Sequence, residues 1–165
     1  QVSVHLHTGN SRVDLERREA DIALRISNEP DDDLFGRRIT QIDYAPFASA
    51  GLIAEHGRKI SKLPWILYDE SAGAVGTEQW YAERAKAPPV IRVTSAVSML
   101  ALAQAGLGGA VLPVPLALDS GLVRLGSRIK GFETDLWCVC HRDLRYSDRV
   151  RSFMKLAVEM KGSLQ

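Results

Sequence analysis

The sequence predicts an α/β fold, because short apolar strands alternate with helical segments along most of its 165 residues. The clearest sign is Val90 to Pro115, where a strand, a polar turn, an apolar helix, a glycine stop and a second apolar strand follow one another. That order is typical of a parallel βαβ unit. A second such cluster is expected before Ser49, so we expect two lobes with mostly parallel sheet.

The elements expected before Ser49 begin with Val2 to His7, where apolar and polar residues alternate as in a half-buried strand. Ser11 is placed to cap a helix over residues 12–18. Asp21 to Ile26 is rich in β-formers and predicts the second strand. An acidic loop, Ser27 to Asp33, is expected to follow it.

The remaining elements follow from the same patterns of apolar runs, caps and glycine or proline stops. Extended segments are expected at Arg37–Thr40, Asp43–Ser49, Leu63–Tyr68, Leu122–Leu125 and Thr134–His141. Helices are expected at Gly51–His56 (closed by Gly57), Thr77–Arg84 and Pro113–Leu118, and from a Ser147 cap to about Lys161 with Val150, Phe153, Ala157 and Met160 on one face.

Composition restricts the class of protein. The hydrophobic share of 45% and charged share of 25% are globular, and a net charge of +1 argues against a nucleic-acid-binding polycation. No apolar run reaches membrane-spanning length, and the first ten residues lack the pattern of a signal peptide. We therefore expect a cytoplasmic chain without membrane contact.

Two groups of residues suggest a metal site, and both have a simpler structural explanation. Cys138 and Cys140 share one face of a predicted strand with poor disulfide geometry, so free, core-facing thiols are favoured over a metal or redox site with His141. His5 and His7 offer two ligands without a clear third, and structural roles are favoured. We expect no metal and no cofactor.

Glycine and arginine clusters are also given structural interpretations. Gly106, Gly108 and Gly109 follow a helix instead of opening one, so they predict a helix end and close packing instead of a dinucleotide site. Four arginines near the C-terminus lie among Asp143 and Asp148, which favours a solvated, self-paired surface. These arginines are Arg142, Arg145, Arg149 and Arg151.

Six segments in order cover essentially the whole chain and together resemble the effector-binding domain of LysR-type transcriptional regulators. They are ADIALRISNEPDDDLFGRRI, DYAPFASAGLIAEHG, LPWILYDE, VTSAVSMLALAQAGLGGAVLP, GLVRL and LWCVCHRDLRYSDRVRSFMKLA. The resemblance implies a two-lobed periplasmic-binding-protein type II architecture with two crossing strands. Lobe I would be residues 1–47 plus 138–165, lobe II residues 48–137, and a small inducer would bind in the cleft between them.

The resemblance also implies what lies outside this chain. Residue 1 matches about the family's second strand, so the helix-turn-helix and the first strand and helix of lobe I are expected to be lacking. DNA would be bound only by the intact protein, as a homodimer or tetramer. The alternative is an extracytoplasmic solute-binding protein of the same architecture. An enzyme on this fold is a further alternative, but no nucleophile motif such as G-x-S-x-G is present.

The candidate effector-binding residues lie in two segments and on one strand. Thr8 matches a family position that faces the cleft, although a turn threonine bonding its own backbone is the simpler explanation, and Gly9 and Asn10 add main-chain N–H groups. Thr94, Ser95 and Ala96 open a helix, where N–H groups and the helix dipole favour an anion. Such a cap also serves the helix alone.

Arg25, near the end of the second predicted strand, is the remaining candidate. It either binds a carboxylate in two-pronged fashion or pairs with Asp21 or the acidic loop. The loop Asp69–Gly73 lies at the same sheet edge as Ser95, but its acids would repel an anion. The sequence therefore predicts a domain that binds a small molecule, with an organic anion as the best fit.

Overall fold

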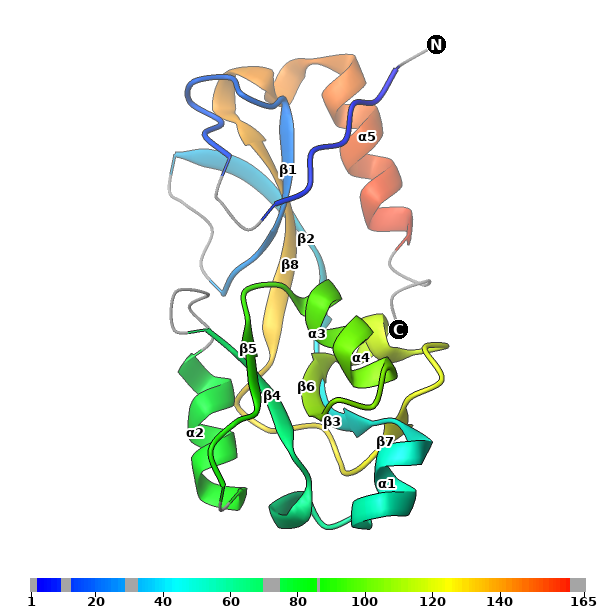
Figure 1. Cartoon of the computed structure of the whole chain (residues 1–165). Coiled ribbons are helices and arrows are strands. Elements are labelled where there is room, and N and C mark those ends of the chain that lie inside the picture. Colours follow the sequence, from blue (N-terminus) through cyan, green and yellow to red (C-terminus); the bar gives the residue numbers. More distant parts are fainter. Residues whose placement is uncertain (1–2, 10–12, 29–32, 70–74, 86, 161–165) are drawn as a thin grey trace. The chain divides into compact units, whose positions relative to one another are not determined.

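The computed structural model describes residues 3–9, 13–28, 33–69, 75–85 and 87–160 (Figure 1). The chain forms two compact units. The first contains residues 1–42 and 134–165, and the second contains residues 43–133.

The first unit is built on a three-stranded antiparallel sheet in the order β1-β8-β2. Its strands are β1 (Ile22–Ile26), β2 (Leu34–Ile42) and β8 (Thr134–His141). The central strand β8 buries Cys138, Val139 and Cys140 completely. Helix α5 (Asp148–Glu159) places Val150 and Met154 in one apolar cluster with the two cysteines. The predicted core-facing role of both thiols is thus confirmed.

The prediction of a βαβ unit before Ser49 is wrong. Residues 3–9 are exposed and form no strand, because an alternating pattern forms a ladder only where a partner strand is present. The expected helix is a single turn in which Asp14 Oδ1 accepts the N–H groups of Glu16 and Arg17 at 2.9 and 3.0 Å. The turn ends at Arg18, whose φ of 58° is left-handed. Asp14 thus caps this turn, and the predicted cap residue Ser11 lies outside the described residues.

The second unit has a five-stranded sheet in the order β5-β4-β6-β3-β7. Its strands are β3 (Tyr44–Ala48), β4 (Trp65–Tyr68), β5 (Ile91–Val93), β6 (Gly109–Pro113) and β7 (Val123–Arg124). Strand β4 is parallel to β5 and β6, so the βαβ unit predicted at Val90–Pro115 is confirmed, with β4 between its two strands. The other pairs of this sheet, β3–β6 and β3–β7, are antiparallel, so the expectation of mostly parallel sheet is wrong.

Helices cover both faces of this second sheet. Leu52 of α1 (Ala50–His56) and Trp80 of α2 (Val75–Arg84) pack in one cluster with Trp65. Met99 of α3 (Ala96–Gln104) and Val114 of α4 (Val114–Ala117) belong to the cluster on the other face. Strand β6 is therefore buried at every position, which explains its uninterrupted apolar sequence.

The glycines after α3 have the packing role that the sequence predicts. Gly106 ends the helix region with a φ of 79°, a left-handed value that favours glycine. A Cβ atom on Gly108 would lie 3.0 Å from Ile66 Cγ1, and one on Gly109 would lie 3.3 Å from the Trp65 ring. These glycines let the start of β6 approach β4 closely.

The C-terminal helix differs from its prediction in detail. A short 3₁₀ helix, η3 (Arg142–Tyr146), precedes it, and another 3₁₀ helix, η1 (Ile60–Lys62), belongs to the second unit. Ser147 occupies the N-cap position but its side chain makes no capping bond. Met160 is 55% exposed, whereas Met154 is buried, because the helix ends at Glu159 before Met160 can join its apolar face. In the part of the chain that the structure describes, no helix is long and apolar enough to cross a membrane.

Candidate functional site

The N-terminus of α3 is the best-formed candidate site in the second unit. Strand β5 leads through Thr94 to Ser95, whose extended backbone (φ −126°, ψ 133°) is typical of an N-cap. Ser95 Oγ accepts the N–H of Ser98 at 3.5 Å, and its main-chain oxygen accepts that of Met99 at 3.0 Å. The N–H groups of Ala96 and Val97 stand at the start of the helix, so no helical carbonyl group is available to accept their hydrogen bonds. The positive end of the helix dipole is therefore combined with N–H donors.

Packing fixes this helix end in place. Met99 and Ala103 are 1% and 0% exposed and belong to the same cluster as Ile66 and Leu112 of the sheet. The first turn of α3 contains no acidic residue that would neutralise its positive end. An anion at Ser95 would therefore meet a rigid and uncompensated helix terminus.

Tyr68 is a neighbour of this terminus that the sequence analysis missed. It ends β4, directly opposite Val93 of β5, and the N–H of Asp69 donates to Val93 O at 2.8 Å. Burial, followed by the nearby Tyr44, raises the pKa of Tyr68 to about 12. Its hydroxyl is therefore neutral at physiological pH and can donate a hydrogen bond. An aromatic hydroxyl ending the strand LPWILY was the available signal.

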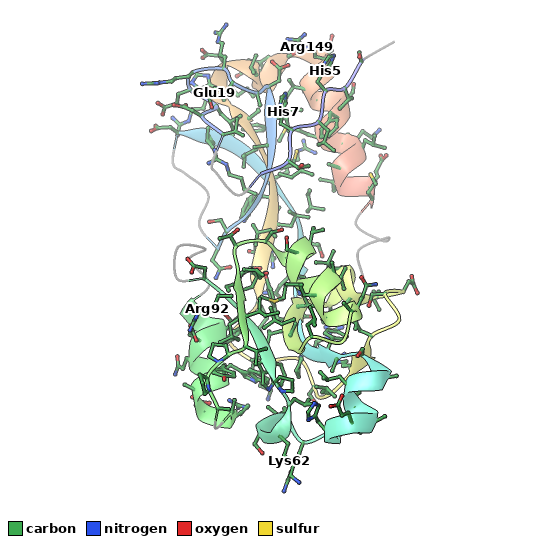
Figure 2. The ribbon with its side chains drawn as sticks, in the orientation of Figure 1. His5, His7, Glu19, Lys62, Arg92 and Arg149 are labelled. Atoms are coloured by element: carbon green, nitrogen blue, oxygen red, sulfur yellow. The ribbon has the colours of Figure 1, made fainter. Side chains whose placement is uncertain are left out.

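Arg92 of β5 ties this strand end to helix α2. Its Nη1, on the side chain labelled in Figure 2, donates to Tyr68 O at 3.0 Å and forms an ion pair with Glu78. This arginine is thus committed to neighbouring groups within the second unit. Most of the loop Asp69–Gly73, which was expected at the same sheet edge as Ser95, lies outside the described residues.

The predicted residues of the first unit are less organised. Thr8 and Gly9 are exposed in a segment without regular structure, and Asn10 lies outside the described residues. Arg25 of β1 donates from Nη2 to Val13 O at 2.9 Å, which ties the strand to the Asp14 turn. Asp21, one proposed partner of Arg25, lies 3.5 Å from Arg149 Nη2.

Trp137 of β8 is a second residue that the sequence analysis did not identify. It lies opposite Arg25 in the β1–β8 register. Its indole Nε1 is buried and has no hydrogen-bond partner among the residues that the structure describes. An unsatisfied buried N–H donor is costly, so this atom is a natural point for a polar ligand or a water molecule. Nothing in the sequence marks this tryptophan, because only the pairing of β1 with β8 places it beside Arg25.

Neither group that was weighed as a metal site is completed in the described residues. His5 and His7 lie along the exposed N-terminal segment (Figure 2), and no cluster of three or more His, Cys, Asp and Glu side chains is found within the described ranges. Burial, followed by the neighbouring Cys140, raises the pKa of Cys138 to about 11. Both thiols are free and buried, and Cys138 is neutral at physiological pH.

Comparison with known proteins identifies this arrangement. The LysR substrate binding domain family matches residues 1–161. The chain belongs to this family. Its fold is that of the two-lobed, type II periplasmic-binding-protein architecture, and the domain is a regulatory effector-binding domain, a class distinct from enzymes.

Solved structures share this fold at low sequence identity. The regulatory domain of CrgA, a LysR-type regulator from Neisseria meningitidis, is 22% identical with a TM-score of 0.75, covering 90% of this chain and 78% of that one. The AmpR effector binding domain from Citrobacter freundii is also 22% identical with a TM-score of 0.75, covering 97% and 84%.

A curated relative adds the wider context. An HTH-type transcriptional regulator from Xanthomonas campestris pv. campestris (strain 8004) is 33% identical over 60 residues, which is 36% of this chain and 17% of the relative. The match thus spans about a sixth of that regulator's length. Nothing in these comparisons favours the alternative of a solute-binding protein.

Proposed function

We propose that this domain senses a small organic anion and thereby controls DNA binding by a longer, oligomeric regulator in the cytoplasm. The observation that carries the proposal is the uncompensated N-terminus of α3 at Ser95, in a chain of the LysR substrate-binding family. A carboxylate there would accept the N–H groups of Ala96 and Val97 and gain from the helix dipole.

The proposal assigns a second set of contacts to the first unit. Thr8, Gly9, Asn10 and Arg25 would supply them, with Thr94 acting beside Ser95. A ligand held by both units shifts their arrangement only as far as it binds one arrangement better than another. That difference in affinity would be transmitted to the DNA-binding part of the regulator.

The identity of the effector is best approached with the protein as cells make it. Native mass spectrometry of freshly purified chain should show a mass increment from a retained small molecule. Benzoate and succinate, titrated by calorimetry, test the anion class directly. Tight binding of a cationic or uncharged metabolite in their place would contradict the proposed chemistry.

The charge at the helix terminus gives the sharpest test. Ser95→Asp keeps a good N-cap but adds a negative charge, so binding of the identified carboxylate should weaken about tenfold or more, as expected from the loss of a charge-assisted contact. Ser49→Asp makes the same change at the N-cap of α1 and should leave affinity unchanged. Equal affinities for the two variants would remove the α3 terminus from the site.

The two-unit contribution has its own test. Thr8→Val and Ser95→Ala should each reduce affinity, and their combined effect should deviate from the sum because both residues would contact one ligand. Ser152→Ala on α5 is the matched control for loss of an exposed serine hydroxyl. Full additivity would show that Thr8 and Ser95 act independently.

A further inference from the structure

The second unit has an open concavity of about 860 Å³ that the effector site does not explain. It forms where the chain after β7 passes beside the start of β3. Its lining includes four cationic side chains and two carboxylates. These are Arg58, Arg124, Arg128 and Lys130, with Asp43 and Glu133.

Two of the guanidinium groups are positioned by neutral atoms. Arg58 Nη2 donates to Arg124 O at 2.9 Å, and Arg124 Nε donates to Gly126 O at 2.7 Å. A carbonyl oxygen orients a guanidinium group without cancelling its charge. Each group keeps further N–H donors, because guanidinium carries five. Arg58 and Arg124 are therefore oriented and still positively charged.

Both carboxylates already have partners of their own. Asp43 forms an ion pair with Arg128, and Glu133 Oε2 accepts the N–H of Gly131 at 2.9 Å. Four cations face two carboxylates, which leaves an excess of two positive charges in one concave surface.

Main-chain bonds make the rim of the concavity rigid. Leu125 N donates to Pro46 O at 2.9 Å, and Ile129 N donates to Tyr44 O at 2.8 Å. The segment that carries Arg124, Arg128 and Lys130 is therefore attached to β3 along its length. A ligand would meet donors that are already ordered, which lowers the entropic cost of binding.

We propose that this concavity is a second ligand site, which binds a small anion carrying two or more phosphate or carboxylate groups. A guanidinium group binds such oxygens in two-pronged geometry, and the volume of the concavity is in the range of small-molecule pockets. The site is independent of the α3 terminus and of the function proposed there.

Inorganic pyrophosphate is a suitable probe. Titrated into the ¹⁵N-labelled chain at low salt, it should shift the amide resonances of Gly126, Ser127 and Lys130 in a saturable manner. Arg124→Gln and Lys130→Gln should each weaken the affinity about tenfold, because each removes a charge-assisted contact. Ser95→Asp should leave pyrophosphate affinity unchanged, which separates this site from the effector site.

The matched control is Arg84→Gln, which removes the same charge from α2, where Arg84 pairs with Glu83. It should retain the affinity of the unchanged chain. If Arg84→Gln weakens binding as much as Arg124→Gln does, the interaction is a general charge effect and the proposal fails. It also fails if pyrophosphate produces no saturable shifts at Gly126 and Ser127.

Discussion

The two sheets of this protein differ in how fully they are covered. In the second unit, Ala110 and Leu112 of β6 are 0% exposed, with helices on both faces of the sheet. In the first unit, Leu24 and Ile26 of the edge strand β1 are 54% and 55% exposed, although their sequence is equally apolar. Apolar residues in a strand therefore indicate the strand itself but do not show how much of it will be buried.

The largest expected effect separates these two environments. Leu112→Ala should destabilise the second unit by about 3 kcal/mol, because it removes buried methyl groups and leaves a cavity. Leu24→Ala should cost less than about 1 kcal/mol, since its side chain already meets solvent. Hydrogen exchange followed by mass spectrometry of peptides from each unit measures both. A cost at Leu24 as large as at Leu112 would show that β1 is covered in solution.

Replacing a glycine by alanine should lower stability at one position in the first unit and raise it at one position in the second. A Cβ atom on Gly36 of β2 would lie 2.8 Å from Val139 Cγ1, so Gly36→Ala should destabilise by roughly 1–3 kcal/mol. Gly51 of α1 has nothing within 4 Å of such an atom, and Gly51→Ala should stabilise by about 0.5 kcal/mol. Urea unfolding compares the two. A neutral Gly36→Ala would show that Val139 can rotate away without cost.

The raised pKa of Cys138 makes the stability of the first unit sensitive to alkaline pH. Its ordinary pKa of 9.0 rises to about 11 in the folded chain. The contribution of the neutral, buried thiol to the free energy of unfolding is therefore complete below pH 9 and is lost as pH rises toward 11. At pH 10 the loss should be about 1 kcal/mol. Cys138→Ala should show a smaller decline when unfolding is followed from pH 8 to pH 11, because Cys140, whose pKa burial also raises, still contributes to it. Identical pH profiles would contradict the burial of the thiol.

A further comparison concerns two serine caps. Ser49 Oγ accepts the N–H of Leu52 at 3.2 Å, so Ser49→Ala should cost about 1 kcal/mol. Ser147 makes no such bond, and Ser147→Ala should be close to neutral. Thermal unfolding of both variants provides the comparison. A larger loss at Ser147 would reverse the assignment of the two caps.

Most elements of the second unit could be predicted because their signals are local. The Gly57 cap, the Ser95 cap and the run GAVLP each specify a backbone state within a few residues. The first unit was predicted less well. Its β1 strand pairs with β8 across more than a hundred residues, and no local pattern specifies that partner or its antiparallel direction.

The candidate site follows the same division. Thr94, Ser95 and Ala96 were found because a helix start is visible in sequence. Tyr68 and Trp137 were missed because their relevance depends on neighbours brought by pairing, Val93 for the first and Arg25 for the second. The assignment of Thr8, Gly9, Asn10 and Arg25 to the effector stays a prediction.

The unsatisfied indole of Trp137 has a practical consequence. The chain contains three tryptophans, and Nε1 of Trp65 donates a hydrogen bond to Ile60 O at 2.9 Å. Growth on 5-fluorotryptophan would therefore yield a fluorine spectrum of three lines, in which the Trp137 line comes from a ring with an open donor. Any molecule that accepts this hydrogen would move that line, so the protein carries its own label for screening crude metabolite extracts.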